Sequence, residues 1–185
     1  MNGSTEQGMA QIHPRRPRIA LCGPSQQMCS EEVYDFGMQL GAAVISAGWG
    51  IVCGGLGGFM EAVCRGAKSV EGTFEGATMG ILPGVDPAAA NPWVDIVVPS
   101  GLNFARNSLV VLSADAVVAV GGGVGTLSEV AFAWQYGKPV VAVNSMGGWS
   151  AELAGKTLDP RRTDHVVSAG SVEEAIAAVR TLLQG

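Results

Sequence analysis

The chain has 185 residues, of which 48% are hydrophobic, 6% aromatic and 15% charged, and its formal net charge is −5. This length supports a single domain with a sizeable core, and the negative charge argues against nucleic acid as a partner, because phosphate-backbone binding needs a basic face. No signal peptide and no membrane-spanning apolar run are recognisable, so we expect a cytoplasmic protein that does not bind membranes.

The first 17 residues differ from the rest in being polar, proline-containing and aperiodic. We therefore predict a disordered N-terminal tail over 1–17, which includes most of the basic cluster Arg15, Arg16 and Arg18, and one domain over 18–185. The four cysteines form no C-x-x-C pair and the two histidines lie far apart, so we expect no metal site.

Short apolar runs alternate with helix-like segments along the remaining chain. We predict strands at 18–22, 50–53, 77–82, 95–98, 116–120, 140–143 and 165–167, and helices at 31–47, 59–70, 103–114, 126–136 and 172–183. This alternation indicates βαβ crossovers, and the uninterrupted apolar strands indicate a sheet covered on both faces. The predicted fold is α/β: a Rossmann-like, doubly wound parallel sheet with helices on both faces. Ligands of such sheets bind beyond the carboxyl ends of the strands.

A glycine-rich segment, Gly121-Gly122-Gly123-Val124-Gly125-Thr126, connects an apolar strand to a helix. Backbone without Cβ atoms admits close approach, and amides at a helix N-terminus attract anions, so a phosphate is the natural ligand. The candidate phosphate-binding residues are Gly122, Gly123, Gly125 and Thr126. A tight turn without a ligand is the alternative. The segment matches neither the P-loop nor the dinucleotide fingerprint, which makes a dinucleotide cofactor improbable.

Glu129 has two interpretations. Thr126 and Glu129 have the spacing of a capping box, which would make the carboxylate purely structural. A carboxylate kept beside a bound phosphate would instead need a balancing cation or a task such as general acid/base catalysis near a sugar. Arg106 supplies a candidate cation near the start of a helix that Asn103 would cap, and Asn107 can add amide hydrogen bonds to a ligand. A solvent-facing Arg106 is the alternative.

Two further strand ends carry candidate ligand-binding residues. Gly54, Gly55, Gly57 and Gly58 repeat the strand–glycine–helix arrangement and are followed by Met60. Gly23 and Ser25 follow the first strand, and the serine could donate a hydrogen bond to a base or a phosphate. The alternatives are plain turns, and a Met60 that packs in the core.

The motifs Gly-Gly-x-Gly-Thr-x-x-Glu, Gly-Gly-x-Gly-Gly-x-Met-Glu-Ala and Gly-x-x-x-Ala-Arg-Asn together resemble a Rossmann-like superfamily once labelled "possible lysine decarboxylase". It contains the lonely-guy cytokinin-activating phosphoribohydrolases and the molybdenum cofactor carrier proteins. The chain departs from the phosphoribohydrolases, which have Met-His-x-Arg-Lys where this chain has Asn103-Phe104-Ala105-Arg106-Asn107. The carrier branch is the better match, and nothing resembles a decarboxylase site.

The resemblance implies two functions. The first is binding of a phosphorylated, nucleotide-like ligand, AMP-like or molybdenum cofactor, with no other cofactor required. The second is hydrolysis of the base–ribose bond of a nucleoside 5′-monophosphate, with Glu129 and Arg106 as catalytic residues. It also implies a homodimer or homotetramer, for which the Ala- and Val-rich segments 108–118 and 130–134 would suit an interface; a buried core predicts the same composition.

Overall fold

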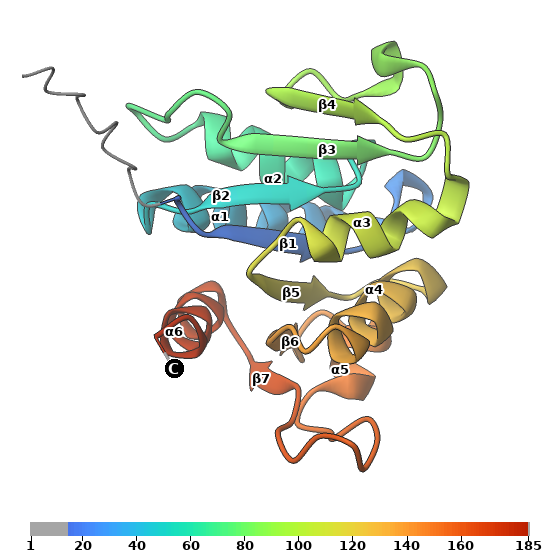
Figure 1. Ribbon diagram of the computed structural model, residues 1–185. Coiled ribbons are helices and arrows are strands. Elements are labelled where there is room, and N and C mark those ends of the chain that lie inside the picture. The colour runs from blue at the N-terminus through green and yellow to red at the C-terminus, as the bar shows by residue number, and fades with distance from the viewer. Residues whose placement is uncertain (1–14, 185) are drawn as a thin grey trace, which may run out of the picture.

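A computed structural model of the protein describes residues 15–184 and places a parallel sheet at the centre of the molecule (Figure 1). The strand order is β4-β3-β2-β1-β5-β6-β7, and every neighbouring pair is parallel. The strands are β1 (Arg18–Cys22), β2 (Gly50–Cys53), β3 (Thr78–Leu82), β4 (Ile96–Pro99), β5 (Ala116–Val120), β6 (Val140–Val143) and β7 (Val167–Ala169). The predicted α/β fold with a parallel sheet is confirmed.

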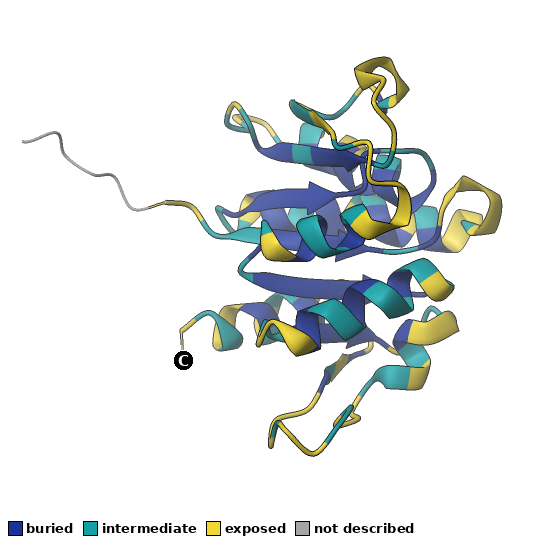
Figure 2. Cartoon of the chain, turned by 45° about the vertical axis from the view of Figure 1, so that its right-hand side comes forward, coloured by how far each residue is buried: buried dark blue, intermediate teal, exposed yellow. Residues whose placement is uncertain are grey.

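Helices cover both faces of the sheet, so the central strands are buried on both sides (Figure 2). One core lies between the sheet and α1, α2 and α6, and the other between the sheet and α3, α4 and α5. This double burial explains why the strands are continuous apolar runs rather than alternating ones. The helices are α1 (Glu31–Ser46), α2 (Phe59–Lys68), α3 (Asn107–Leu112), α4 (Val124–Gln135), α5 (Gly148–Leu153) and α6 (Val172–Leu182).

The structure differs from the sequence prediction in several details. The expected helix over 103–114 is a 3₁₀ turn, Asn103–Arg106, followed by α3, and Asn103 does not cap it. Asn103 instead has φ +49° and donates its backbone N–H to the Pro83 carbonyl, which interrupts regular helix geometry. The last strand begins two residues later than predicted, and α5 was not predicted.

The strand order reverses direction at β1. The chain runs outward from β1 through β2, β3 and β4, and then crosses back to place β5 on the other side of β1. The segments that follow β1 and β5 therefore lead to helices on opposite faces of the sheet, α1 and α4. A crevice opens beyond the carboxyl ends of the strands at such a reversal, and ligands bind there in open α/β sheets.

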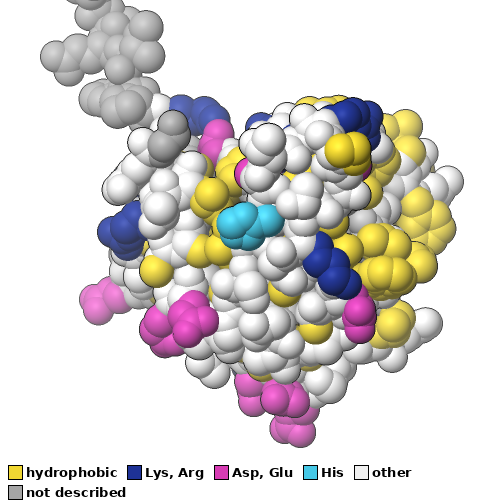
Figure 3. Space-filling view, turned by 90° about the horizontal axis from the view of Figure 1, so that it is seen from below, with side chains coloured by type: hydrophobic (Ala, Val, Ile, Leu, Met, Phe, Trp, Pro, Cys, Tyr) yellow, Lys and Arg dark blue, Asp and Glu magenta, His cyan; other side chains and the backbone are white. Residues whose placement is uncertain are grey.

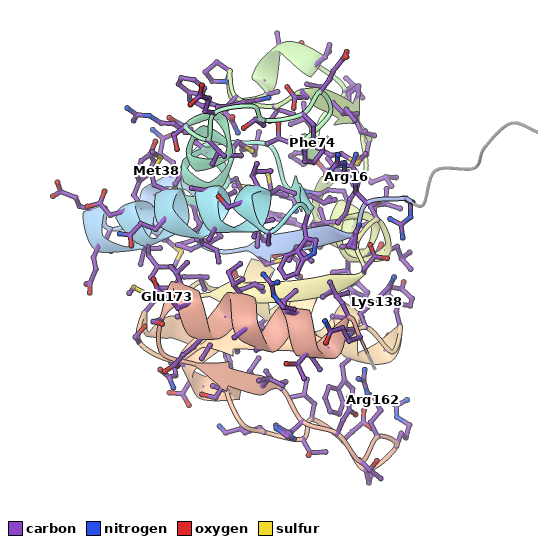
Figure 4. All side chains as sticks on the ribbon, turned by 90° about the vertical axis from the view of Figure 1, so that its left-hand side faces the viewer. Arg16, Met38, Phe74, Lys138, Arg162 and Glu173 are labelled. Atoms are coloured by element: carbon purple, nitrogen blue, oxygen red, sulfur yellow. The ribbon has the colours of Figure 1, made fainter. Side chains whose placement is uncertain are left out.

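The N-terminal prediction lies mostly outside the described residues, which begin at Arg15. Within them, Arg15 forms an exposed ion pair with Asp115, and the Arg16 guanidinium lies 4.5 Å from the centre of the Phe74 ring (Figure 4). Arg18 already belongs to β1 and donates to the Gly76 carbonyl. Between residues 15 and 184, no helix is both long enough and apolar enough to span a bilayer.

Helices α1 and α2 touch through two glycines. A Cβ atom on Gly41 would lie 2.1 Å from the Val63 carbonyl oxygen, and one on Gly66 would lie 2.0 Å from the Met38 carbonyl oxygen. Both obstacles are backbone atoms, which cannot move aside as a side chain can.

We therefore expect Gly41→Ala to destabilise the protein by about 3 kcal/mol, because the two helices must separate. Urea unfolding followed by circular dichroism measures this change. Gly84→Ala is the matched control, since a Cβ at Gly84 meets no atom within 4 Å. Equal midpoints for the two variants would contradict the prediction.

Candidate functional site

A cavity of about 240 Å³ lies at the carboxyl ends of β1, β2 and β5, where the strand order reverses. It brings together segments that lie far apart in the sequence. Ten of the predicted site residues line it: Gly23, Ser25, Gly54, Met60, Arg106, Asn107, Gly123, Gly125, Thr126 and Glu129. The cavity therefore lies where the sheet topology predicts a ligand site.

The first two glycines of the loop after β5 form a turn that packs against α5. Gly121 and Gly122 have φ of +56° and +82°, a region that favours glycine. The Ser150 hydroxyl accepts a hydrogen bond from the Gly121 amide at 2.6 Å and donates one to the Val143 carbonyl, also at 2.6 Å. A Cβ on Gly122 would lie 2.0 Å from the Thr126 hydroxyl oxygen. These two glycines thus serve the turn, and Gly122 does not line the cavity.

Gly123 and Gly125 have a different setting. Gly123 precedes the first residue of α4 and has φ −103°, while a Cβ on Gly125 would meet no atom within 4 Å. The backbone amides of the first helical turn, Val124 to Thr126, have no carbonyl within the helix to which they could donate. The positive end of the α4 dipole therefore faces the cavity, an arrangement that attracts anions.

The capping-box interpretation of Glu129 is wrong. Helix α4 begins at Val124, two residues before the predicted start, and no side chain caps it. Thr126 is the third helical residue rather than the cap, and Glu129 lies in the second turn, buried beside the cavity. By contrast, the same spacing at Ser171 and Glu174 caps α6: the Ser171 hydroxyl accepts from the Glu174 amide at 3.2 Å.

Arg106 and Glu129 form a buried ion pair. One Arg106 guanidinium nitrogen donates to the Glu129 carboxylate at 3.3 Å and also to the Asn107 side-chain oxygen. The side chains are only 11% and 9% exposed. The amide of Asn107 donates in turn to the Ser128 hydroxyl at 2.7 Å, which links the start of α3 to α4.

Two polar atoms at this cavity have no hydrogen-bond partner among the described residues. They are the Arg106 Nε and the Thr126 hydroxyl oxygen, both of which are buried. Buried donors without partners are costly, so they are expected to find one in a ligand. Both can donate a hydrogen bond, which favours an acceptor-rich, anionic group.

Burial controls the charge state of Glu129. Removal from water raises the pKa of this carboxyl group to about 7, although the Arg106 charge and the neighbouring Cys22 lower it. The pKa of the Cys22 thiol is raised, first by burial and then by the Glu129 charge. Glu129 can therefore accept or release a proton near neutral pH, as a general acid or base requires.

The glycine-rich loop after β2, residues 54–58, mainly packs against neighbouring segments of the chain rather than lining the cavity. Gly55 and Gly58 have positive φ, and Cβ atoms there would meet Leu82 at 2.8 Å and the Gln26 backbone at 2.6 Å; Gly57 faces the Gln26 side chain. None of these three lines the cavity. Gly54 does, and its bare Cα leaves room for the Arg106 guanidinium, which a Cβ would approach to 2.5 Å.

Sequence reasoning missed several residues of the cavity wall. They are Leu21, Cys22, Pro24, Met28, Phe104 and Val124. The place of Cys22 at the end of a strand is a usable signal, whereas Phe104 departs from the family motif and so gives no signal of a binding role. Within 15–184, no group of three His, Cys, Asp or Glu side chains is placed to hold a metal ion.

A model of the SLOG cluster4 family matches residues 16–176. The chain belongs to the SLOG cluster4 family. The superfamily relationship predicted from the glycine motifs, with lonely-guy proteins and molybdenum cofactor carriers, is thereby confirmed. The region that matches the SLOG model contains both glycine-rich loops and the Arg106–Glu129 ion pair.

Two solved structures share the fold over more than nine tenths of this chain, and a further relative is similar in sequence. The molybdenum cofactor binding protein of Rippkaea orientalis is 35% identical with a TM-score of 0.79, covering 91% of this chain and 98% of that one. The molybdenum cofactor carrier protein of Chlamydomonas reinhardtii is also 35% identical, with a TM-score of 0.77 and coverages of 92% and 100%. A cytokinin riboside 5′-monophosphate phosphoribohydrolase of Mycobacterium tuberculosis is 28% identical over 162 residues, 80% of this chain and 85% of the relative.

Proposed function

We propose that the protein binds a phosphorylated, nucleotide-like ligand at this cavity and acts as a carrier rather than as an enzyme. The phosphate is held by the amides that open α4, with Arg106 as its counter-ion. The observation that carries the proposal is the pair of buried, unpartnered donors, Arg106 Nε and Thr126 Oγ1, at the positive end of a helix dipole. A bound phosphate supplies acceptors for both.

The ligand is AMP-like or the molybdenum cofactor. Two relatives that are 35% identical over more than nine tenths of this chain are named for the molybdenum cofactor, which supports the second choice. Any molybdenum would arrive inside that cofactor. The predicted homodimer or homotetramer remains a prediction.

A second candidate function is hydrolysis of the base–ribose bond of a nucleoside 5′-monophosphate. The raised pKa of Glu129, about 7, favours it, because a general acid or base works best near the ambient pH. A carboxylate can also stabilise positive charge that develops on the ribose. Against this function, Phe104 and Asn107 replace the His and Lys of the phosphoribohydrolase motif.

The first experiment combines binding and turnover. The purified protein is incubated with AMP and other nucleoside monophosphates, thermal shift reports binding, and chromatography of the same samples reports free base. We expect stabilisation without base release. Base release that is lost in Glu129→Gln would establish the hydrolase, and no stabilisation by any phosphorylated ligand would overturn both candidates.

We expect Gly123→Val to abolish ligand binding while leaving the fold intact. The valine side chain would occupy space at the opening of α4, whereas an added Cβ meets only Met28, at 3.4 Å, and φ is not positive. Isothermal titration with AMP, and the melting temperature of the free protein, measure the two effects. Gly84→Val is the control, and normal AMP affinity in Gly123→Val would refute this phosphate position.

A further inference from the structure

The cavity has an apolar rim that the phosphate proposal leaves unexplained. Met28, Phe104 and Val124 line it, yet they are 65%, 87% and 78% exposed. The floor is different, because Thr126 and Glu129 there are buried. In Figure 3, apolar side chains gather on the right-hand side, toward which β1 to β5 point in Figure 1. A floor that contains buried polar groups therefore continues into an apolar rim.

The rim residues come from three separate segments. Met28 ends the 3₁₀ helix Gln26–Met28 after β1, Phe104 belongs to the 3₁₀ turn before α3, and Val124 opens α4. Single exposed apolar residues are ordinary on protein surfaces, but a cluster at the mouth of a cavity marks a binding surface. Met28 and Val124 lie close because β1 and β5 are neighbours in the sheet, and the crossover from β4 to β5 brings Phe104 to the same cavity.

Met28 connects the rim to the floor. Its methyl carbon would lie 3.4 Å, and its sulfur 3.6 Å, from a Cβ built on Gly123, so the thioether lies against the residue that precedes α4. A group attached to a phosphate at that helix end would meet this side chain. Methionine adapts to flat ring systems and makes favourable contacts between sulfur and aromatic rings.

We propose that Met28, Phe104 and Val124 form a subsite for the flat heteroaromatic ring, a purine or a pterin, of the ligand whose phosphate the floor holds. This inference rests on the proposed function and assigns the residues that contact the ring of its ligand. The cavity volume supports it: about 240 Å³ approaches the lower limit of small-molecule sites, roughly 300 Å³, and is more than a phosphate alone fills.

A planar ring suits this rim better than an aliphatic group does. Its faces can stack on the Phe104 ring and touch the Met28 thioether, while its edges remain available to water or to Ser25, which also lines the cavity. Stacking on an aromatic side chain accepts any ring with a π face, so the rim selects a class of ligand rather than one base.

The test uses three probes and isothermal titration calorimetry on the full chain. AMP carries both ring and phosphate, ribose 5-phosphate lacks the ring, and adenosine lacks the phosphate. We expect AMP to bind about five- to 100-fold more tightly than ribose 5-phosphate, and Phe104→Ala to remove that advantage while changing ribose 5-phosphate affinity less than about twofold. Tyr136→Ala is the matched control, an exposed aromatic residue outside the cavity, and leaves all affinities unchanged.

The outcomes separate the subsite from the phosphate site. Equal affinities for AMP and ribose 5-phosphate, unaffected by Phe104→Ala, would overturn the ring subsite and leave phosphate binding standing. Adenosine binding that depends on Phe104, without any binding of ribose 5-phosphate, would support the subsite and overturn the phosphate site. No binding of any probe would overturn both. A change of oligomer size in Phe104→Ala, with AMP affinity unchanged, would show a contact between subunits and also overturn the subsite.

Discussion

Replacing Arg106 by methionine is expected to weaken AMP binding at least about 100-fold, because the buried charge that we propose to pair with the phosphate is lost. Methionine keeps much of the length of the side chain and so limits the loss of packing. The Arg106 Nε, which has no partner among residues 15–184, is the donor that the ligand is proposed to satisfy. Isothermal titration with AMP measures the effect.

The same substitution makes a second, spectroscopic prediction. Arg106 is the largest influence that lowers the pKa of Glu129, so Arg106→Met should raise this pKa further above 7. Carbon-13 NMR of labelled glutamate carboxyl groups follows the titration directly. Arg161→Met, which removes an exposed arginine paired with Asp159, serves as the control for both measurements. AMP affinity within about threefold of the wild type would contradict the role of Arg106, since a lost buried charge pair costs far more.

Replacing Glu129 by glutamine is expected to remove a pH dependence of stability between about pH 4.5 and 7.5. Folding raises the pKa of this group from 4.5 to about 7, so the folded state binds the proton more tightly than the unfolded state does. Its contribution to stability is complete below pH 4.5 and is lost as the pH rises through 7. A shift of this size corresponds to about 3 kcal/mol.

Urea unfolding at pH 5, 6, 7 and 8 measures this difference. The wild type should lose stability across the series, and Glu129→Gln should have a flatter profile. Asp95 and Asp115 have lowered pKa values, so their contribution to the stability of the protein is lost only at more acidic pH. They therefore do not interfere with the measurement between pH 5 and 8. Parallel profiles for the two proteins would show that Glu129 is already ionised at pH 5.

The protonation state of Glu129 should also affect the affinity for AMP. Above pH 7 the ionised Glu129 repels a phosphate and competes with it for Arg106, so wild-type affinity for AMP should fall between pH 6 and 8. Free AMP titrates identically in both experiments, so the difference between the pH profiles of wild type and Glu129→Gln isolates the interaction of Glu129 with the bound phosphate and Arg106. If the candidate hydrolase activity exists, the same variant keeps its affinity for AMP and loses turnover.

Much of the fold could be predicted from local sequence. The β5 and β6 runs, Ala116–Val120 and Val140–Val143, are buried throughout, and this two-sided burial imposes a continuous apolar pattern that is visible without a structure. The short segments were harder to predict. Helix α5, Gly148–Leu153, starts at a pair of glycines of positive φ, Gly147 and Gly148, and its Ser150 hydroxyl accepts a hydrogen bond from the Gly121 amide, a contact between residues remote in sequence.

The candidate site shows why a sequence motif does not fix the role of each residue in it, since that role depends on neighbours in space. Gly58 and Gly123 have similar neighbours in the sequence, yet a Cβ on Gly58 would strike the Gln26 backbone, whereas Gly123 faces the cavity. The capping-box pattern at Thr126 and Glu129 failed for a related reason. Helix α4 starts earlier than the pattern suggests, and Glu129 pairs instead with Arg106, 23 residues away.

The reversal of strand order at β1 should also affect how the protein unfolds. The cavity takes Gly54 and Met60 from beyond β2 on one side and Gly123 to Glu129 from beyond β5 on the other, with Gly23 between them. A ligand that contacts both sides joins the two halves of the sheet into one cooperative unit. The loaded protein would then resist proteases by closing off partial unfolding routes, in which β6, β7 and α6 detach while β2 and β3 stay folded. Without a bound ligand those routes would stay open, so the ligand-free protein would be the form more exposed to degradation.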